Sequence, residues 1–154
     1  MTSCDNEAVP AWFRRLTVHE RGLFVLAAAG ALGLLLLGLC LTPDPRGLGT
    51  HEQLGLPPCA TQWLFGIPCP FCGMTTAFSL VSRGRLVDGF VTQPAGAMLA
   101  VACAGAGLAS MAGAVSGYWP ASRFRLAERR WAIAAGGFIL AAAWLYRIAV
   151  VFLR

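Results

Sequence analysis

The chain has 154 residues, of which 57% are hydrophobic and 12% are charged. Soluble domains carry about 25% charged residues, so this composition excludes an ordinary water-soluble globule as well as a disordered chain. The formal net charge is +5. The dense basic run lies between two hydrophobic segments rather than over a broad surface, which excludes a nucleic-acid footprint. The length allows one domain, and a membrane must bury the three long apolar runs.

Three apolar runs predict membrane-spanning helices, over residues 23–41, 95–118 and 131–153. The first run contains no charge and is about 28 Å long as a helix, which matches a hydrocarbon core of about 30 Å. Pro94 precedes the second run and Tyr118 and Trp119 close it, as expected at a membrane boundary. We therefore expect an all-α, multi-pass membrane protein that forms a single membrane domain over residues 1–154, with the lipid bilayer as its main partner.

Small residues recur every four positions along the second span. They are Gly105, Ala109, Gly113 and Gly117. Small residues four apart lie on one face of a helix and let a second helix approach closely. Such close packing drives helix association in membranes, because lipid supplies no hydrophobic drive for it. The same pattern also occurs in alanine-rich spans without a packing role. We interpret this stripe as a helix-packing face, with its partner in the same chain, in a second copy of the chain or in another membrane protein.

The distribution of arginines predicts the orientation in the membrane. Residues 1–22 and the link 119–130 hold most of the arginines outside the spans, namely Arg14, Arg15, Arg21, Arg123, Arg125, Arg129 and Arg130. Positive charges favour the cytoplasmic side, so we expect a cytoplasmic N-terminus and place residues 42–94 outside. Arg147, near the end of the third span, is interpreted as a side chain that snorkels to the outer interface.

The outer segment 42–94 divides into a loop and a short helix. Residues 42–68 are rich in proline and glycine, which predicts a loop. Residues 70–82 predict an amphipathic helix, since Met74, Ala77, Phe78 and Val81 recur at helical spacing with threonines and serines on the other face. At about 20 Å this helix is too short to cross a bilayer, so we expect it to be interfacial or re-entrant. A connection over residues 84–93 leads to the second span.

Cys69 and Cys72 stand at the start of this predicted helix, three residues apart. That spacing places both thiols on one side, and the helix dipole favours thiolates there. The pair is compatible with a structural disulfide, a reversible redox pair or half of a site for zinc or another soft metal. Cys59 is a candidate third sulfur and His51 a candidate nitrogen ligand, although the second Cys-x-x-Cys of a full zinc site is absent. A disulfide from Cys59 to one of the pair stays equally open.

The stretch from Trp63 to Phe78 resembles the signature of a bacterial membrane-protein family known only as domain of unknown function 2752. That signature has an upstream cysteine, a Gly-x-Pro-Cys-Pro-x-Cys-Gly-x-Thr-Arg-Ala core, a glycine-rich turn and an Asn-Pro before a hydrophobic span. The residues that fall on it include Cys59, Pro68, Cys69, Pro70, Cys72, Gly73, Thr75, Ala77, Gly84 and Pro94. Two positions depart from it, because Thr76 stands where the family usually has Arg and Gln93 where it usually has Asn. The missing arginine weakens a reactive or anion-binding role.

These patterns favour a small protein of the bacterial inner membrane with its cysteine motif on the outer side. We favour a non-enzymatic module in which Cys59, Cys69 and Cys72 form a structural or metal-binding cluster, with zinc as the metal to test first. The residues Pro68, Pro70, Gly73, Thr75 and Thr76 support the motif. The alternative is a membrane thiol-disulfide oxidoreductase in which Cys69 and Cys72 exchange electrons with a quinone or a partner protein.

Overall fold

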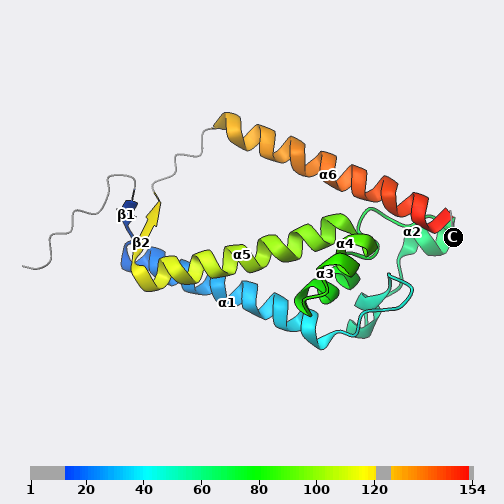
Figure 1. Cartoon of the computed structure of the whole chain (residues 1–154), viewed down its shortest axis with the longest axis horizontal. Helices are drawn as coiled ribbons and strands as arrows, with labels where there is room; N and C mark the ends of the chain where they lie inside the picture. The colour runs from blue at the N-terminus through cyan, green and yellow to red at the C-terminus, as the bar shows by residue number, and fades with distance from the viewer. Residues whose placement is uncertain (1–12, 121–125, 153–154) are drawn as a thin grey trace, which may run out of the picture.

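The computed structural model describes residues 13–120 and 126–152, so Cys4, Arg123 and Arg125 lie outside the described residues. The described part contains three helices that are long and apolar enough to cross a membrane, which confirms an all-α, multi-pass membrane protein. In chain order the elements are β1 (Phe13–Arg15), α1 (Val18–Cys40), the 3₁₀ helix η1 (Thr50–Leu54), α2 (Ala60–Phe65), α3 (Met74–Ser82), α4 (Leu86–Thr92), α5 (Pro94–Ser116), β2 (Tyr118–Pro120) and α6 (Leu126–Phe152) (Figure 1).

The spanning helices α1 and α5 form the central pair of the molecule (Figure 1). They approach closely because small residues face each other, and a Cβ added at Gly107 would lie only 2.8 Å from the Cβ of Ala31. Contacts of this kind stabilise helix pairs in lipid by van der Waals packing. Ala97 and Ala100, nearer the start of α5, are fully buried. The pair is therefore held by close apolar packing where Gly107 faces Ala31, whereas the buried start of α5 packs against α3 and α4.

The predicted small-residue stripe is divided in the structure. Gly113 is buried against Trp119, where an added Cβ would lie 2.9 Å from the indole ring, and Gly117 is the left-handed C-cap of α5 with φ 74°. A Cβ added at Gly105 would meet nothing within 4 Å, and Ala109 is exposed. Within the described residues, the half of the stripe near the C-terminal end of α5 is closely packed, whereas Gly105 and Ala109 line an open hollow beside Phe24 of α1.

Arginines and polar residues form hydrogen bonds with the backbone groups that are left unpaired at the ends of α1 and α5. Thr17 and Glu20 form a reciprocal capping box at the start of α1. Arg83 donates hydrogen bonds to the carbonyls of Gly38 and Leu39 at the end of α1, at 2.8 and 2.6 Å. Arg21 does the same for Ala114 O at the end of α5, at 2.8 Å. The last carbonyls of a helix have no partners within it, so these contacts remove an energetic cost.

A short antiparallel ladder closes one end of the α1–α5 pair. β1 pairs with β2 in a register that joins Phe13 to Pro120 and Arg15 to Tyr118. Beside it, the rings of Phe24 and Trp119 meet edge to face with centroids 4.6 Å apart. Strands of three residues are too short to show period-two alternation, so the sequence did not predict them.

Helix α3 differs from its prediction in start and in surroundings. It begins at Met74 rather than at residue 70, and it packs between α1 and α5 with a buried polar face. The hydroxyl of Ser79 lies 2.8 Å from Gly38 O and 2.6 Å from Leu41 O at the end of α1. Hydroxyls that bind orphaned carbonyls can be buried at low cost, which explains why the polar face of α3 turns inward.

The segments expected to be irregular contain three further short helices, so the prediction of a plain loop over 42–68 was wrong in part. η1 and α2 have five and six residues, and α4 lies within the expected connection 84–93. Helices this short have no readable periodicity. Gly55 and Gly66 end the first two with positive φ of 76° and 68°, conformations that glycine adopts without strain.

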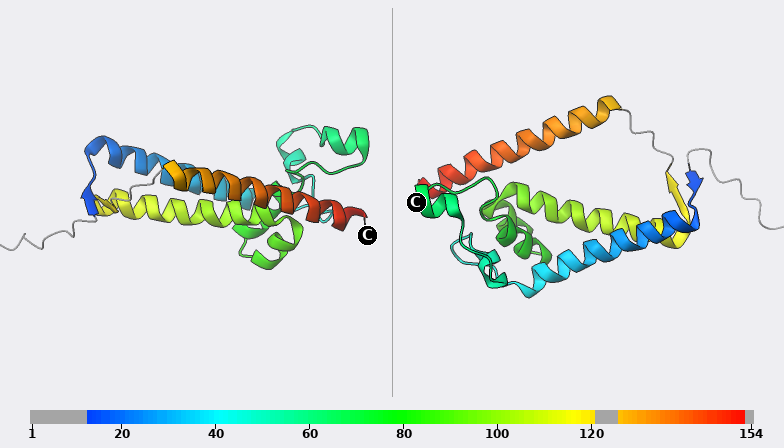
Figure 2. Two further views of the ribbon diagram at one scale, coloured as in Figure 1. Left: turned by 90° about the horizontal axis from the view of Figure 1, so that it is seen from above. Right: turned by 180° about the vertical axis from the view of Figure 1, so that it is seen from behind.

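Helix α6 lies apart from the central pair over its first half and approaches the rest of the molecule at its C-terminal end (Figures 1 and 2). There it donates three kinds of hydrogen bond to backbone carbonyls, from Trp144 to Pro68 O, from Tyr146 to Val91 O and from Arg147 to Gly47 O, each at 2.8 Å. Arg147 is only 4% exposed and also donates to Thr92 O at 3.1 Å. The snorkelling prediction was wrong, because the carbonyls of Gly47, in a loop, and Thr92, at the end of α4, lie within reach of the guanidinium.

Candidate metal centre

Three cysteines from two segments meet at the end of the molecule where α6 terminates. Cys59 immediately precedes α2, and Cys69 and Cys72 lie in the turn before α3. Their sulfur atoms all lie within 4.8 Å of one another, and those of Cys69 and Cys72 are 3.4 Å apart. All three are free thiols in the structure. The expectation that the pair opens the helix is corrected, since the thiols precede it.

A tight turn brings Cys69 and Cys72 together. The amide of Cys72 donates to Cys69 O at 3.0 Å, and Gly73 then adopts a left-handed conformation with φ 85°. A Cβ at Gly73 would lie 2.7 Å from Gly47 O, so both the backbone conformation and the close approach require glycine. The turn therefore depends on the residue that follows the second cysteine.

Two side chains from other helices hold the carbonyls of this motif. Trp144 of α6 donates to Pro68 O at 2.8 Å. Gln93, fully buried at the start of α5, donates to Pro70 O at 3.0 Å while its own carbonyl oxygen accepts from Ala95 N at 3.2 Å. The glutamine thus caps α5 and fixes the motif at once, which gives a structural reason for the residue that departs from the family signature.

The second departure from that signature, Thr76, is also explained by its contacts. Its hydroxyl lies 2.8 Å from that of Thr50, and both side chains are buried. Thr50 in turn accepts a hydrogen bond from Asp44 N at 3.0 Å. Where the family usually has Arg, this chain therefore has a neutral hydroxyl pair, Thr76 and Thr50, that joins α3 to η1. Thr75 lies on the apolar side of α3 and lines a separate apolar hollow.

The surroundings of the cluster shift the pKa values of Cys59 and Cys72 in opposite directions. Burial raises the pKa of Cys72 to about 12, and its hydrogen bonds with the other two thiols act in the same direction. Burial also raises the pKa of Cys59, but the backbone N–H of Gln62 and the Thr61 hydroxyl outweigh it and lower the pKa to about 6. The cluster therefore combines one thiol that ionises readily with one that stays protonated unless a cation replaces its proton.

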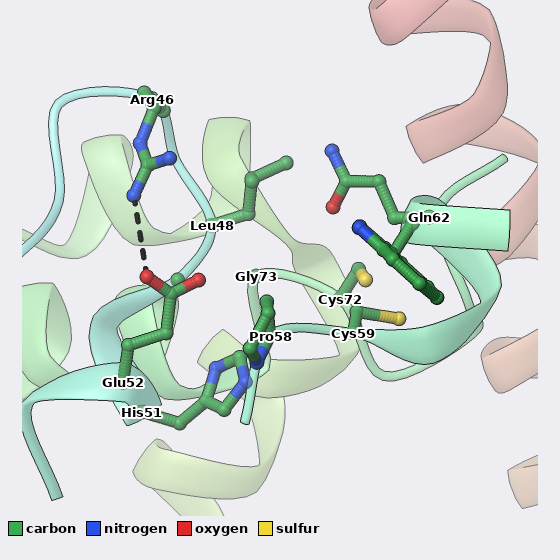
Figure 3. Close-up of a pocket in the computed structure, with 11 residues that line it drawn as sticks. Arg46, Leu48, His51, Glu52, Pro58, Cys59, Gln62, Cys72 and Gly73 are labelled. Atoms are coloured by element: carbon green, nitrogen blue, oxygen red, sulfur yellow. Dashed lines mark ion pairs between the residues drawn. The ribbon is translucent and has the colours of Figure 1, made fainter. Parts of the chain in front are cut away.

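The cluster borders a cavity of about 270 Å³. Figure 3 shows the sulfurs of Cys59 and Cys72 on one side of it and the Arg46–Glu52 ion pair, at 3.7 Å, on the other. His51 lies on the wall of the same cavity, with Nε2 3.2 Å from Pro57 O. Among the described residues the group of close ligand atoms contains the three thiols, and it does not include His51.

This arrangement suits a soft metal ion. Tetrahedral zinc with Zn–S bonds of about 2.3 Å separates its sulfurs by about 3.8 Å, which small side-chain rotations of the present cluster reach. Three thiolates would leave a tetrahedral ion one ligand short, and Cys59 and Cys72 line the adjacent cavity. A site of this form accepts either a fourth ligand from the cavity or a trigonal ion such as Cu(I).

Sequence reasoning named the three cysteines but missed the residues that hold them. Gln93 was noted only as a departure from a signature, and Trp144 only as an aromatic near a membrane boundary. Arg147 carried the clearest signal, because a charge within a hydrophobic run marks a residue with a specific partner. Its carbonyl partners, Gly47 and Thr92, lie 100 and 55 residues earlier in the chain.

The fold and the cluster define a three-span helical membrane protein with a site of three thiols. Residues 59–107 match the model of a family described as protein of unknown function (DUF2752), which confirms the resemblance found in the sequence. The matched region begins at Cys59, includes α2, α3 and α4 and ends within α5. No curated protein and no solved structure matches the chain.

Proposed function

We propose that this protein is a non-enzymatic membrane module whose Cys59, Cys69 and Cys72 bind a soft metal ion, with zinc as the leading candidate. The observation that carries the proposal is the meeting of three sulfur atoms within 4.8 Å from two separate segments. Thiolate sets of this kind select zinc and copper(I) over hard cations. The bound ion would tie the loop around Cys59 to the turn before α3 and so stabilise the outer part of the molecule.

We also propose that the protein resides in a bacterial inner membrane with its N-terminus in the cytoplasm and the thiol cluster outside. The support is the concentration of arginines in residues 1–22 and 119–130, at the start of α1 and around the start of α6. Arg83, which counts against this asymmetry, has a structural explanation because it binds the last carbonyls of α1. Thiol labelling with a reagent that does not cross membranes tests this orientation, and labelling only after the cells are opened would overturn it.

The metal proposal is tested by metal analysis of the purified full chain. We expect about one zinc per chain, loss of that zinc in Cys59→Ser, Cys69→Ser and Cys72→Ser, and its retention in the control Cys103→Ser. Cys103 lies within α5, away from the cluster. Because the thiols must lose protons to bind, zinc affinity should fall as the pH is lowered. Metal-free wild-type protein with intact thiols after incubation with zinc or copper(I) would overturn the proposal.

Cobalt(II) provides an independent measurement at the same site. Cobalt adopts the coordination of zinc and absorbs visible and near-ultraviolet light when thiolates bind it. We expect sulfur-to-cobalt charge-transfer bands that weaken when any one of the three cysteines is replaced by serine. A spectrum with no thiolate bands would contradict ligation by the cluster.

One observation favours a second function, that of a thiol-disulfide oxidoreductase. The sulfurs of Cys69 and Cys72 are only 3.4 Å apart, close enough to oxidise without a large backbone movement. In this reaction the dithiol gives two electrons and two protons to a disulfide of a partner protein, which becomes a dithiol as Cys69 and Cys72 form a disulfide. A Cys72→Ser variant should then trap a mixed disulfide through Cys69. Absence of any trapped species would count against this function.

A further inference from the structure

The short helix α2 exposes apolar side chains that contact no protein core. Trp63, Leu64 and Phe65 are 79%, 63% and 70% exposed, and α2 has no buried residue. Phe71, in the turn that carries the cysteines, is 60% exposed. Four large apolar side chains outside the spanning helices are thus exposed, and exposed apolar surface of this kind indicates contact with lipid or with another protein.

The sequence around α2 is also free of charge. Residues 53–82 form thirty consecutive positions without Asp, Glu, Lys, Arg or His, although none of them lies in a spanning helix. Pro57, Pro58, Pro68 and Pro70 fall in this stretch and have no backbone N–H. Fewer unpaired donors and no charges both lower the cost of placing irregular backbone next to hydrocarbon. The composition therefore matches a lipid surface and lacks the charged groups typical of a water-facing loop.

The position of α2 agrees with this composition. It lies at the same end of the molecule as the C-terminus of α6 (Figure 1), although Figure 2 shows that it projects away from that helix. The hydrogen bond from Trp144 to Pro68 O fixes the following loop to α6. Tryptophan and other aromatic side chains concentrate at the level where spans leave the hydrocarbon, and Trp63 is held near that level.

The walls of the thiol cavity indicate which side faces lipid. One wall carries Arg46, His51 and Glu52, and the other carries two of the cysteines, Cys59 and Cys72, together with Gln62 of α2 (Figure 3). Trp63 also lines the cavity. The charged wall can face water and the α2 wall can rest on lipid only if the cavity opens along the membrane surface.

We propose that α2 and Phe71 lie in the lipid headgroup boundary, with Trp63, Leu64 and Phe65 in contact with phospholipid. The mouth of the three-thiol cavity then sits at the membrane surface, between the charged wall and the bilayer. This surface is independent of the proposed metal, because its side chains are apolar and none of the three thiols belongs to it.

The test uses the full chain labelled with 5-fluorotryptophan in phosphatidylcholine nanodiscs without added metal. A Trp63→Phe variant assigns the fluorine NMR signal of Trp63. We expect a phospholipid that carries a nitroxide near its headgroup to abolish that signal. Trp144, which donates its indole N–H to Pro68 O inside the protein, provides an internal reference for the fold.

A second variant, Leu64→Glu, tests whether the apolar face of α2 is what holds Trp63 in the lipid. Leu64→Glu adds a charge to the exposed face of α2, so we expect the Trp63 signal to escape the lipid nitroxide and to become sensitive to a water-soluble gadolinium chelate. An unchanged Trp144 signal would show that the fold is retained. A wild-type Trp63 signal that the lipid nitroxide leaves unchanged overturns the proposal. If the chelate broadens that signal, α2 lies in water, and if neither reagent does, protein covers it.

Discussion

The two contacts that hold the spanning helices together differ in chemistry. α1 and α5 meet through small residues such as Gly107 and Ala31 along much of their length. α6 is fastened at its C-terminal end by Trp144, Tyr146 and Arg147, which donate to carbonyls of loops and short helices. Packing therefore builds the central pair, whereas hydrogen bonds attach α6 to the segments that surround the thiols. Changes in one contact should leave the other largely intact.

Arg147 should be the most sensitive residue of the second contact. Arg147→Ala leaves the carbonyls of Gly47 and Thr92 without their donor, and an unsatisfied buried acceptor costs about 1–3 kcal/mol. We expect a loss of about 2–4 kcal/mol in the free energy of unfolding, measured by denaturant titration in detergent micelles. Arg147→Lys keeps the charge and one donor, so it should recover part of this loss. Equal stability of Arg147→Ala and wild type would contradict the hydrogen-bonded tether.

Gly73 links that tether to the thiol cluster, because the Gly47 carbonyl faces both Gly73 and Arg147. Gly73→Ala forces a side chain into φ 85° and places its Cβ 2.7 Å from that oxygen. A left-handed conformation alone costs about 1–2 kcal/mol for a residue with a Cβ, so zinc affinity should fall about tenfold or more. Competition with a chelator measures this change. Gly66→Ala, also at positive φ but with nothing within 4 Å, controls for backbone strain without overlap.

The sequence predicted the parts of the fold that depend on hydrophobic length. Residues 23–41 and 95–118 correspond to α1 and α5 with shifts of a few residues at the ends, since uncharged apolar runs show where the chain must cross lipid. It did not predict that the polar face of α3 turns inward. That outcome depends on whether Ser79 meets orphaned carbonyls of α1, which is a property of the assembled helices.

The candidate site likewise has a part that the sequence predicts and a part that depends on the assembled fold. The spacing of Cys69 and Cys72 is a local pattern, and that spacing alone is enough to predict two sulfurs side by side. The sequence named Cys59 only as a candidate third sulfur, because the path of residues 60–68 decides whether it reaches the pair. Gln93 and Trp144 hold the motif through hydrogen bonds to Pro70 O and Pro68 O, and backbone carbonyls leave no trace in the sequence.

The packing contact can be tested with two glycines of α5 that lie two residues apart. An added Cβ at Gly107 would lie 2.8 Å from Ala31, whereas one at Gly105 would meet nothing within 4 Å. Gly107→Ala should therefore destabilise the protein by about 1–3 kcal/mol through overpacking. Gly105→Ala should be neutral or stabilise it by up to about 1 kcal/mol through helix propensity. Thermal unfolding in micelles measures both variants, and similar losses at the two positions would contradict the packing described for α1 and α5.

The smallest expected effect isolates one hydrogen bond of α6. Trp144→Phe keeps an aromatic ring but removes the indole N–H that donates to Pro68 O at 2.8 Å. A single hydrogen bond contributes about 0.5–1.5 kcal/mol, so the global stability should fall by about 1 kcal/mol. Amide hydrogen exchange should speed up around Cys69 and remain unchanged at the centre of α5, because the lost bond holds the motif and not the central pair. Faster exchange throughout α5 would show that the attachment of α6 and the packing of α1 against α5 are coupled.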